Sequence, residues 1–295
     1  MKMKGPIQKI ALGTVTFGRE IDRLQSFRVM DEAAIRGILF FDTAEAYGQG
    51  ASETIIGSWL QAHPSMKQQV TIASKLLPPY SSASFKQRVE ACLRRLKRSY
   101  IDLLFFHSWD PSVLNPDVLI RAEALIQQGV VKAFGVSNFN AAQLTSLLEV
   151  QQRYRLSPVA AVQNNHNLAV SDLDVSLLSL CRKHQVRVIT YSPLGAGFLT
   201  GKHTRRIEQG SRFDRMPAHR DIYFTKESLE SLQRLSTAAG GQKDLQVQWA
   251  LAWALHHPDV DLVLVGARSV EHLQQAVDAA LFDDPDFLQR LRPFK

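Results

Sequence analysis

Four side chains with acid–base chemistry follow short apolar runs of the sequence: a carboxylate, a phenol, an amine and an imidazole. Asp42 closes one such run, and Tyr47 comes five positions later. Lys75 and His107 directly follow two further runs. If these runs are neighbouring parallel strands, their carboxyl ends bring the four side chains to one shared opening.

Together these groups could donate a proton to a developing alkoxide. A phenol with a pKa near 10 is a poor donor at neutral pH, and general acid catalysis favours a lower value. The ammonium of Lys75 would lower the pKa of Tyr47, and Asp42 would balance that ammonium, because a buried unpaired charge is costly. His107 could hydrogen-bond a substrate carbonyl and orient it. A protein that reduces carbonyls needs such a proton donor, with the hydride coming from a cofactor.

Each of these residues also has a structural explanation when taken alone. An Asp after a strand is often a turn former, and a Lys at a strand end is usually solvated. A loop Tyr commonly packs half-buried, and a single His is more often structural than catalytic. Their occurrence at consecutive strand ends favours the functional interpretation over these four separate ones.

The elements that would position them alternate regularly along the chain. Short β-branched or aromatic runs lie at 9–13, 38–42, 70–74, 101–106, 131–136, 159–163, 186–190 and 262–265, with amphipathic stretches of helix length between them. This alternation predicts right-handed βαβ crossovers and a parallel sheet. Eight units favour a closed barrel, and no GxGxxG turn follows the first run as an open doubly wound sheet would require. The sequence therefore predicts one α/β domain over residues 1–295, a (β/α)8 TIM barrel whose active site lies at the C-terminal mouth of the strands.

Helix ends and long connections can be placed in the same way. Asn140, Ser171 and Ser269 each precede a periodic segment in the position of an N-cap. The connections at 76–84, 108–116 and 194–225 are long, and long connections at the mouth of a barrel are typically functional.

Composition excludes several classes of protein. Hydrophobic residues make up 45% and charged residues 21% of the 295, which is typical of a globular chain and not of a disordered one. No apolar run reaches the 18 residues of a membrane span, and the N-terminus lacks the apolar stretch of a signal peptide. Cys92 and Cys181 are too few for a disulfide framework or a Cys-based zinc site. We expect a cytoplasmic protein that binds no membrane and no metal.

The net charge of +7 is not gathered into one stripe of the sequence. Its densest cluster, residues 94–98, closes an amphipathic helix, where cations suit the helix dipole. We therefore expect no nucleic-acid partner, whereas a positive field near a phosphorylated cofactor would be favourable.

Five segments resemble, in order, the motifs of the aldo-keto reductase family. FDTAEAYG at 41–48 resembles FDTAxxYG, and YIDLLFFH at 100–107 resembles YIDLxxxH. GVSNF at 135–139 and YSPLGAGFLTGK at 191–202 match two further motifs, and VGARS at 265–269 resembles the PGAR-type element. The resemblance runs from Ile10 to about Ala280.

The resemblance implies NADPH-dependent reduction of an aldehyde or ketone to the alcohol, with a small-molecule carbonyl substrate. Tyr47 would be the general acid, Lys75 and Asp42 would tune it, and His107 would orient the carbonyl. NADH remains open as the cofactor. The substrate, the oligomeric state and the direction of the reaction in the cell also remain open.

The resemblance also implies a dinucleotide site. Ser137, Asn138 and Gln163 would bind the nicotinamide carboxamide, Tyr191 would stack on the ring, and Thr14 would lie near the ribose. The residues implied around the phosphates are Ser192, Leu194, Lys202, Arg212 and, from the last motif, Gly266 and Arg268. Arg268 could approach a 2′-phosphate, because a guanidinium matches the geometry of a phosphate.

The chain departs from the family near the adenine and beside the nicotinamide. Many relatives carry Arg or Gln and then Glu-Asn at positions that here read His272, Gln275 and Ala276. This departure leaves the preference for NADPH over NADH open. His166 takes a position that is usually aromatic, which could alter packing or the wall of the substrate site.

The sequence says less about the substrate than about the fold, the reaction or the cofactor. Aromatic residues on the expected mouth loops could line the pocket or anchor those loops: Phe17, Tyr80, Trp109, Phe213 and Tyr223. Basic residues of the longest loop could steer an anionic substrate or only solvate a flap: Arg205, Arg206, Arg215 and Arg220.

Two other functions remain open at this point. A nucleotide-sensing regulatory subunit of the same fold would bind the dinucleotide with little turnover, although the intact set of four residues argues against it. A non-redox barrel lyase or isomerase would not bind the dinucleotide at all.

Overall fold

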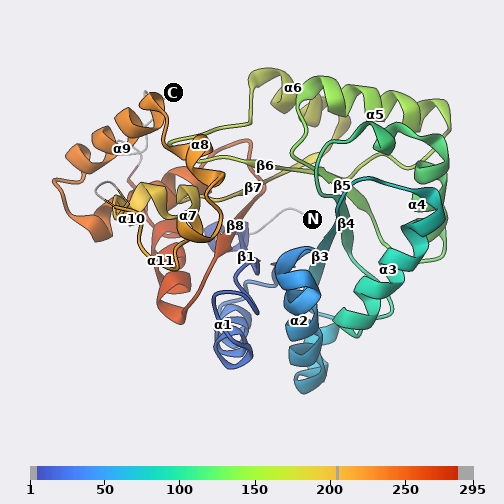
Figure 1. The fold of residues 1–295 in the computed structure, drawn as a ribbon, viewed down its shortest axis with the longest axis horizontal. Helices are drawn as coiled ribbons and strands as arrows, with labels where there is room; N and C mark the ends of the chain where they lie inside the picture. Colours follow the sequence, from blue (N-terminus) through green and yellow to red (C-terminus); the bar gives the residue numbers. More distant parts are fainter. Residues whose placement is uncertain (1–4, 204–205, 285–295) are drawn as a thin grey trace.

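Eight parallel strands close into a barrel in the order β1 to β8 (Figure 1). The computed structural model describes residues 5–203 and 206–284. The strands are β1 (Ile10–Gly13), β2 (Phe40–Asp42), β3 (Thr71–Leu76), β4 (Leu103–Phe106), β5 (Phe134–Ser137), β6 (Ala161–Asn165), β7 (Arg187–Tyr191) and β8 (Leu262–Gly266). Strand β8 pairs with β1, with Ile10 beside Val263, so the sheet has no free edge. The predicted (β/α)8 barrel is confirmed.

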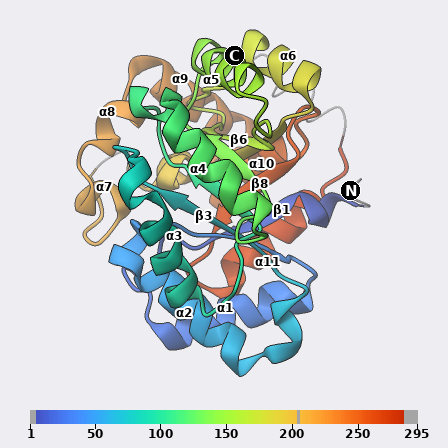
Figure 2. The same ribbon diagram turned by 90° about the vertical axis from the view of Figure 1, so that its right-hand side faces the viewer.

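Helices follow the strands and cover the outside of the barrel (Figure 1). They are α1 (Arg23–Ile35), α2 (Ala51–Ala62), α3 (Ser82–Leu96), α4 (Pro116–Gln127), α5 (Ala141–Arg153), α6 (Val175–His184), α7 (Arg212–Arg215), α8 (His219–Tyr223), α9 (Lys226–Ala238), α10 (Lys243–Leu255) and α11 (Val270–Ala280). Helices α3 and α4 pack side by side (Figure 2). Among the described helices, none is both long and apolar enough to cross a membrane.

Two of the three predicted N-caps are confirmed. Asn140 caps α5 in a complete capping box, and Ser269 precedes α11 in extended conformation. Ser171 is not an N-cap, because α6 begins four residues later and Asp174 caps it. The hydroxyl of Ser171 instead lies 2.7 Å from Nδ1 of His166, within the turn that follows β6.

Alternation of side chains along the strands determines which residues reach the mouth, the end of the barrel where the strands terminate. On β1, Ile10 and Leu12 pack toward the helices, whereas Ala11 faces the lumen. The lumen is filled by Ala11, Ala73, Leu103, Phe105, Ala161, Ile189, Leu262 and Leu264. Inward positions at or next to the carboxyl ends of the strands then hold Gly13, Asp42, Lys75, His107, Ser137, Gln163, Tyr191 and Gly266. Seven of the predicted site residues thus form one layer above the apolar side chains that fill the lumen.

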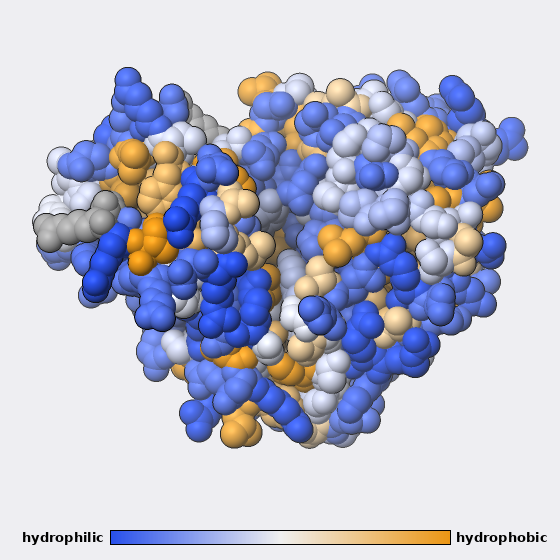
Figure 3. Space-filling view, viewed as in Figure 1, coloured by the Kyte–Doolittle hydropathy of each residue, from blue (hydrophilic) through white to orange (hydrophobic). Residues whose placement is uncertain are grey.

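The segment from residue 194 to 225, called the β7–α9 segment, is the longest connection. Its described residues include a 3-10 turn, η5 (Gly195–Thr200), and the helices α7 and α8. Figure 3 shows the surface hollowed between the side that carries α7 and α8 and the side that carries α3 to α5. A separate surface cavity of about 290 Å³ opens beside α6 and the start of β7, and no predicted site residue lines it.

Candidate active site

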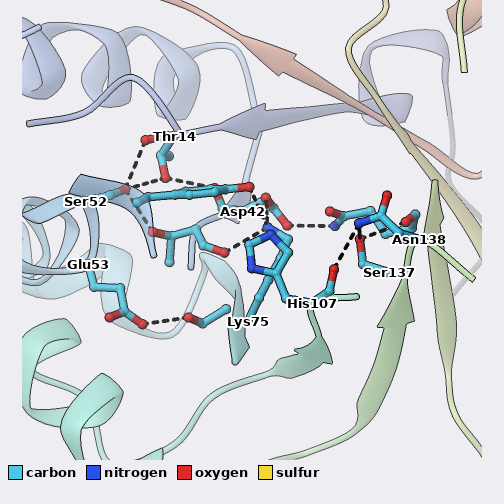
Figure 4. Close-up of polar contacts among 12 residues, drawn as sticks. Thr14, Asp42, Ser52, Glu53, Lys75, His107, Ser137 and Asn138 are labelled. Atoms are coloured by element: carbon cyan, nitrogen blue, oxygen red, sulfur yellow. Dashed lines mark hydrogen bonds and ion pairs between the residues drawn. The ribbon is translucent and has the colours of Figure 1, made fainter. Parts of the chain in front are cut away.

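Lys75 is the centre of the site (Figure 4). Its Nζ donates hydrogen bonds to the carboxylate of Asp42, to the backbone oxygen of Thr43 at 2.9 Å and to Oη of Tyr47 at 3.1 Å. An ammonium has three protons, so all of its donors are used. Because Oη of Tyr47 accepts from Lys75, the phenol's own proton is left to point elsewhere.

His107 lies beside this group in its neutral form. Its ring is 5.9 Å from the ring of Tyr47 and nearly perpendicular to it. Burial, together with the charge of Lys75, lowers the pKa of His107 to about 3. Its Nδ1 is buried, and no described residue forms a hydrogen bond with that atom. The imidazole can therefore hydrogen-bond a substrate without carrying a charge.

Burial and charge act in opposite directions on the other three groups. Burial raises the pKa of Asp42, while Lys75 and Gln163 oppose that rise. Burial alone would lower the pKa of Lys75, but Asp42 and Tyr47 raise it above its usual value. Desolvation raises the pKa of Tyr47, Lys75 lowers it, and the negative charge of Asp42 raises it again. Lys75 thus acts in the predicted direction, but the net pKa of the phenol is raised, and Tyr47 keeps its proton at neutral pH.

Gln163 has a contact that the sequence did not reveal. Its Nε2 donates to Oδ1 of Asp42 at 2.8 Å. Strands β6 and β2 lie on opposite sides of the eight-stranded ring, so this bond crosses the barrel. The second carboxylate oxygen of Asp42 receives Lys75, and both oxygens of this buried acid are therefore satisfied.

Replacing Gln163 by Met should lower the free energy of unfolding by about 1.5–3 kcal/mol, because hydrogen bonds to charged groups contribute that much. Gln246 offers a matched control: it is equally buried, but its Nε2 donates to the neutral backbone oxygen of Leu199. Gln246→Met should cost about 0.5–1.5 kcal/mol. Urea unfolding measures both variants, and equal losses would contradict the role of Gln163 at a charged acceptor.

A buried hydroxyl network lies beneath Asp42. Thr14 Oγ1 donates to the backbone oxygen of Asp42 at 2.8 Å and lies 2.7 Å from Oγ of Ser52. Thr43 donates to the same Ser52 oxygen at 2.8 Å. The Thr14 hydroxyl thus forms its hydrogen bonds inside the protein. The prediction that Thr14 lies near a ribose therefore depends only on its position next to Asp42. Ser52 was not predicted, because a single Ser within a helix carries no pattern.

The turn that carries Tyr47 is held from two sides. Gly48, Gln49 and Gly50 have φ values of 56°, 56° and 89°, and such left-handed backbone favours glycine. The Glu45 carboxylate accepts the Leu77 N–H at 2.7 Å and pairs with Arg88 of α3. These contacts fix the phenol against β3, where Lys75 stands.

The residues predicted around the carboxamide are brought together. Asn138, with a φ of 60°, donates from Nδ2 to the backbone oxygen of His107 at 2.9 Å. Its Oδ1 accepts the hydroxyl of Tyr191 at 2.6 Å. Ser137 donates to the backbone oxygen of Gln163 at 2.9 Å. Residues at the ends of β4, β5, β6 and β7 thus form one polar wall of the mouth. Figure 4 shows Ser137 and Asn138 of this wall beside His107.

The residues predicted around the phosphates lie along the β7–α9 segment and at β8. Ser192 has a φ of 57°, and Leu194 packs against the core. Lys202 pairs with Glu208 at 3.0 Å. Arg212 is half-buried, and its charge lowers the pKa of Tyr47 and of Tyr191, so the guanidinium lies near the mouth.

Gly266 is the last residue of β8, and Arg268 follows it two positions later. Apart from its two chain neighbours, no described residue has an atom within 4 Å of the place that a Cβ of Gly266 would occupy, which leaves room for a ligand. Arg268 is exposed. Of the positions near the expected adenine, His272 is half-buried, whereas Ala276 is fully buried in the core and has no side chain to offer a nucleotide.

Four of the five aromatic candidates for the substrate wall are core residues. Phe17, Tyr80, Phe213 and Tyr223 are buried, and the Tyr80 hydroxyl donates to the backbone oxygen of Ser108. They anchor their loops, which was the alternative interpretation. Only Trp109 is half-exposed.

Two of the basic candidates stabilise the loops themselves. Arg215 donates to the backbone oxygen of Arg19 at 3.0 Å, and Arg220 to that of Phe213 at 3.1 Å. Arg206 is exposed, and Arg205 lies outside the described residues. Among the residues that the structure describes, no three His, Cys, Asp or Glu side chains are grouped to hold a metal ion.

Comparison with known proteins gives one family. The model of the Aldo/keto reductase family matches residues 9–289. The chain is 28% identical to "Uncharacterized oxidoreductase YrpG" of Bacillus subtilis, covering 92% of this chain and 87% of that protein. It is 25% identical to "Norsolorinic acid reductase B" of Dothistroma septosporum, covering 92% and 74%. It is 28% identical to "Probable voltage-gated potassium channel subunit beta" of Arabidopsis thaliana, covering 90% and 84%.

Proposed function

The chain belongs to the aldo/keto reductase family, and from that premise we propose that it reduces an aldehyde or ketone to the alcohol with NADPH, using Tyr47 as the proton donor. Relatives named as oxidoreductases support the reaction class. The observation that carries the proposal is the fully coordinated ammonium of Lys75, which donates to Tyr47 and leaves the phenolic proton free for a substrate.

The residues at the mouth fit a nicotinamide dinucleotide, the kind of cofactor that this family generally uses. Gln163 and Asn138 bring to the mouth amides that could exchange their bonds to Asp42 and Tyr191 for bonds to a carboxamide, and Tyr191 provides a ring for stacking. Open space above Gly266 and the nearby charge of Arg212 suit the phosphates. When bound, the reduced nicotinamide supplies the hydride.

The protein's own residues supply the proton that the reduction requires. As the carbonyl oxygen gains negative charge, Tyr47 transfers the proton of Oη to it, and Lys75 stabilises the phenolate that remains. Asp42 and Gln163 keep the ammonium in place. Neutral His107 donates an N–H to the carbonyl oxygen and orients it. The apolar side chains in the lumen below exclude water, which strengthens each of these interactions.

A regulatory subunit that binds the dinucleotide with little turnover is the second candidate. The relative named as a potassium channel subunit beta favours it. The complete arrangement of Asp42, Tyr47, Lys75 and His107 favours the enzyme, because a sensor would not need a proton donor.

Two measurements test the proposal. Quenching of tryptophan fluorescence reports binding of NADPH and NADH, and NADPH absorbance follows turnover with aldehydes, sugars, quinones and pyridoxal. Binding with turnover supports the reductase. Binding without turnover across the whole panel supports the regulatory subunit. Absence of dinucleotide binding would contradict both and favour a non-redox barrel enzyme.

A further inference from the structure

A buried imidazole with an unused nitrogen lies in the β7–α9 segment. His203 follows Lys202, is only 3% exposed and packs edge-on against Phe213, with the ring centres 5.1 Å apart. Its Nδ1 accepts the backbone N–H of Glu208 at 3.5 Å, so in the neutral ring the proton sits on Nε2. Nε2 is buried, and no described residue accepts its hydrogen bond. Buried donors are nearly always paired, so this one marks a place for an acceptor.

That nitrogen faces a strained turn of the backbone. A Cβ at Gly197 would stand 3.7 Å from Nε2 of His203 and 3.6 Å from Cε of Lys202, so both side chains flank the same point. Gly195, Ala196 and Gly197 have successive φ values of 57°, 56° and 95°. Ala196 adopts this conformation although its Cβ disfavours it, and such strain clusters at ligand sites.

Two cations and a second imidazole surround His203. Besides burial, the charges of Lys202 and Arg268 lower the pKa of both His203 and His272, so these four side chains form one cluster. Two carboxylates face it. Glu208 pairs with Lys202 at 3.0 Å with its side chain about half exposed, and Glu271 acts on His272 from the first turn of α11. The half-exposed carboxylate of Glu208 thus occupies the place beside Lys202 that a bound anion would take.

We propose that His203 donates its Nε2 proton to a phosphate oxygen of the bound dinucleotide, beside Lys202, and that Glu208 covers Lys202 until this phosphate displaces it. The proposal rests on the proposed function for the identity of the ligand. Its chemistry is that of a phosphate, which in NADPH is either the pyrophosphate or the 2′-phosphate.

Two substitutions separate the hydrogen bond that His203 donates from the packing of its ring against Phe213. His203→Phe keeps a ring against Phe213 and removes the donor, whereas His203→Gln keeps a donor and removes the ring. Tryptophan quenching should show NADPH affinity falling about tenfold or more in His203→Phe, and within about threefold of wild type in His203→Gln. His184→Gln, exposed at the end of α6, should be unchanged.

The dinucleotide used in the assay identifies the phosphate. A loss for NADPH alone places His203 at the 2′-phosphate, and an equal loss for NADH places it at the pyrophosphate. The reverse pattern, with affinity kept by His203→Phe and lost by His203→Gln, would overturn the proposal, because the imidazole would then serve only packing.

Glu208→Gln tests the displaced carboxylate by a gain of affinity. Removing the competitor for Lys202 should tighten NADPH binding by about two- to fivefold. Glu90→Gln removes an exposed carboxylate of α3 and should leave affinity unchanged, which controls for net charge. Unaltered affinity in Glu208→Gln would contradict this part of the proposal.

Failure of the proposed function can be told apart from failure of this site. If the wild type binds neither NADPH nor NADH, inorganic pyrophosphate serves as the probe. If pyrophosphate raises the Tm of the wild type but not of His203→Phe, His203 belongs to a phosphate site although the protein binds no dinucleotide. If pyrophosphate does not raise the Tm of the wild type, the proposed phosphate site is overturned.

Discussion

Replacing Tyr47 by Phe is expected to lower turnover of NADPH with a reactive aldehyde by about 10²–10⁴-fold, the usual contribution of a general acid. The substitution keeps the ring that stands against His107 and removes only Oη, the atom that receives Lys75 at 3.1 Å. Affinity for NADPH should stay within about twofold, because Tyr47 is not one of the predicted dinucleotide contacts. Steady-state kinetics and fluorescence quenching measure the two effects separately.

The pH profile of the wild type checks the same assignment. Reduction needs protonated Tyr47, and its raised pKa moves the loss of activity to high pH, as pH rises through that value. His107 stays neutral down to about pH 3, so it contributes no change near neutrality. We expect a flat profile between about pH 5 and 9. An activity that titrates near pH 6.5 would assign the proton to another group. So would a Tyr47→Phe variant as active as the control Tyr100→Phe, which removes a phenol oxygen before the start of β4, at the opposite end of that strand from His107.

Much of the site follows from the period of two along a strand. Once the eight runs are placed, Ala73 in the lumen requires Lys75 to face inward two residues later, and Ala161 requires Gln163. The carboxyl ends of a barrel then bring these positions to one layer. The sequence could predict this layer because local alternation and strand order determine it together.

Contacts across the ring could not be predicted in this way. Gln163 reaches Asp42 over a separation of 121 residues, and no local pattern encodes which inward side chains meet. The aromatic candidates show the same limit, since Phe213 and Tyr223 lie on a mouth loop by sequence, yet their side chains are buried. Whether a loop aromatic lines a pocket or anchors the loop depends on tertiary packing.

Replacing Lys75 by Met should abolish most turnover and lower the free energy of unfolding by about 3–5 kcal/mol, the usual cost of breaking a buried ion pair. Asp42 is 1% exposed, and its carboxylate would keep only the hydrogen bond from Gln163. The double variant Asp42→Asn/Lys75→Met removes both charges and should recover most of that loss while remaining inactive. Urea unfolding at pH 7, with both single variants, completes the double-mutant cycle.

The double-mutant cycle distinguishes two reasons for the buried charges of Asp42 and Lys75, which are stability of the fold and proton transfer. Desolvation of a buried pair can exceed its attraction, so apolar or neutral replacements are often as stable as the pair itself. A stable, inactive double variant would mean that the ammonium of Lys75 serves the proton transfer from Tyr47 and that the fold does not need it. If the double variant instead lost the sum of the two single losses, Asp42 and Lys75 would stabilise the barrel independently of each other. The ion pair would then contribute no coupling energy, and Lys75 would stabilise the barrel through its bonds to Thr43 and Tyr47 and not through Asp42.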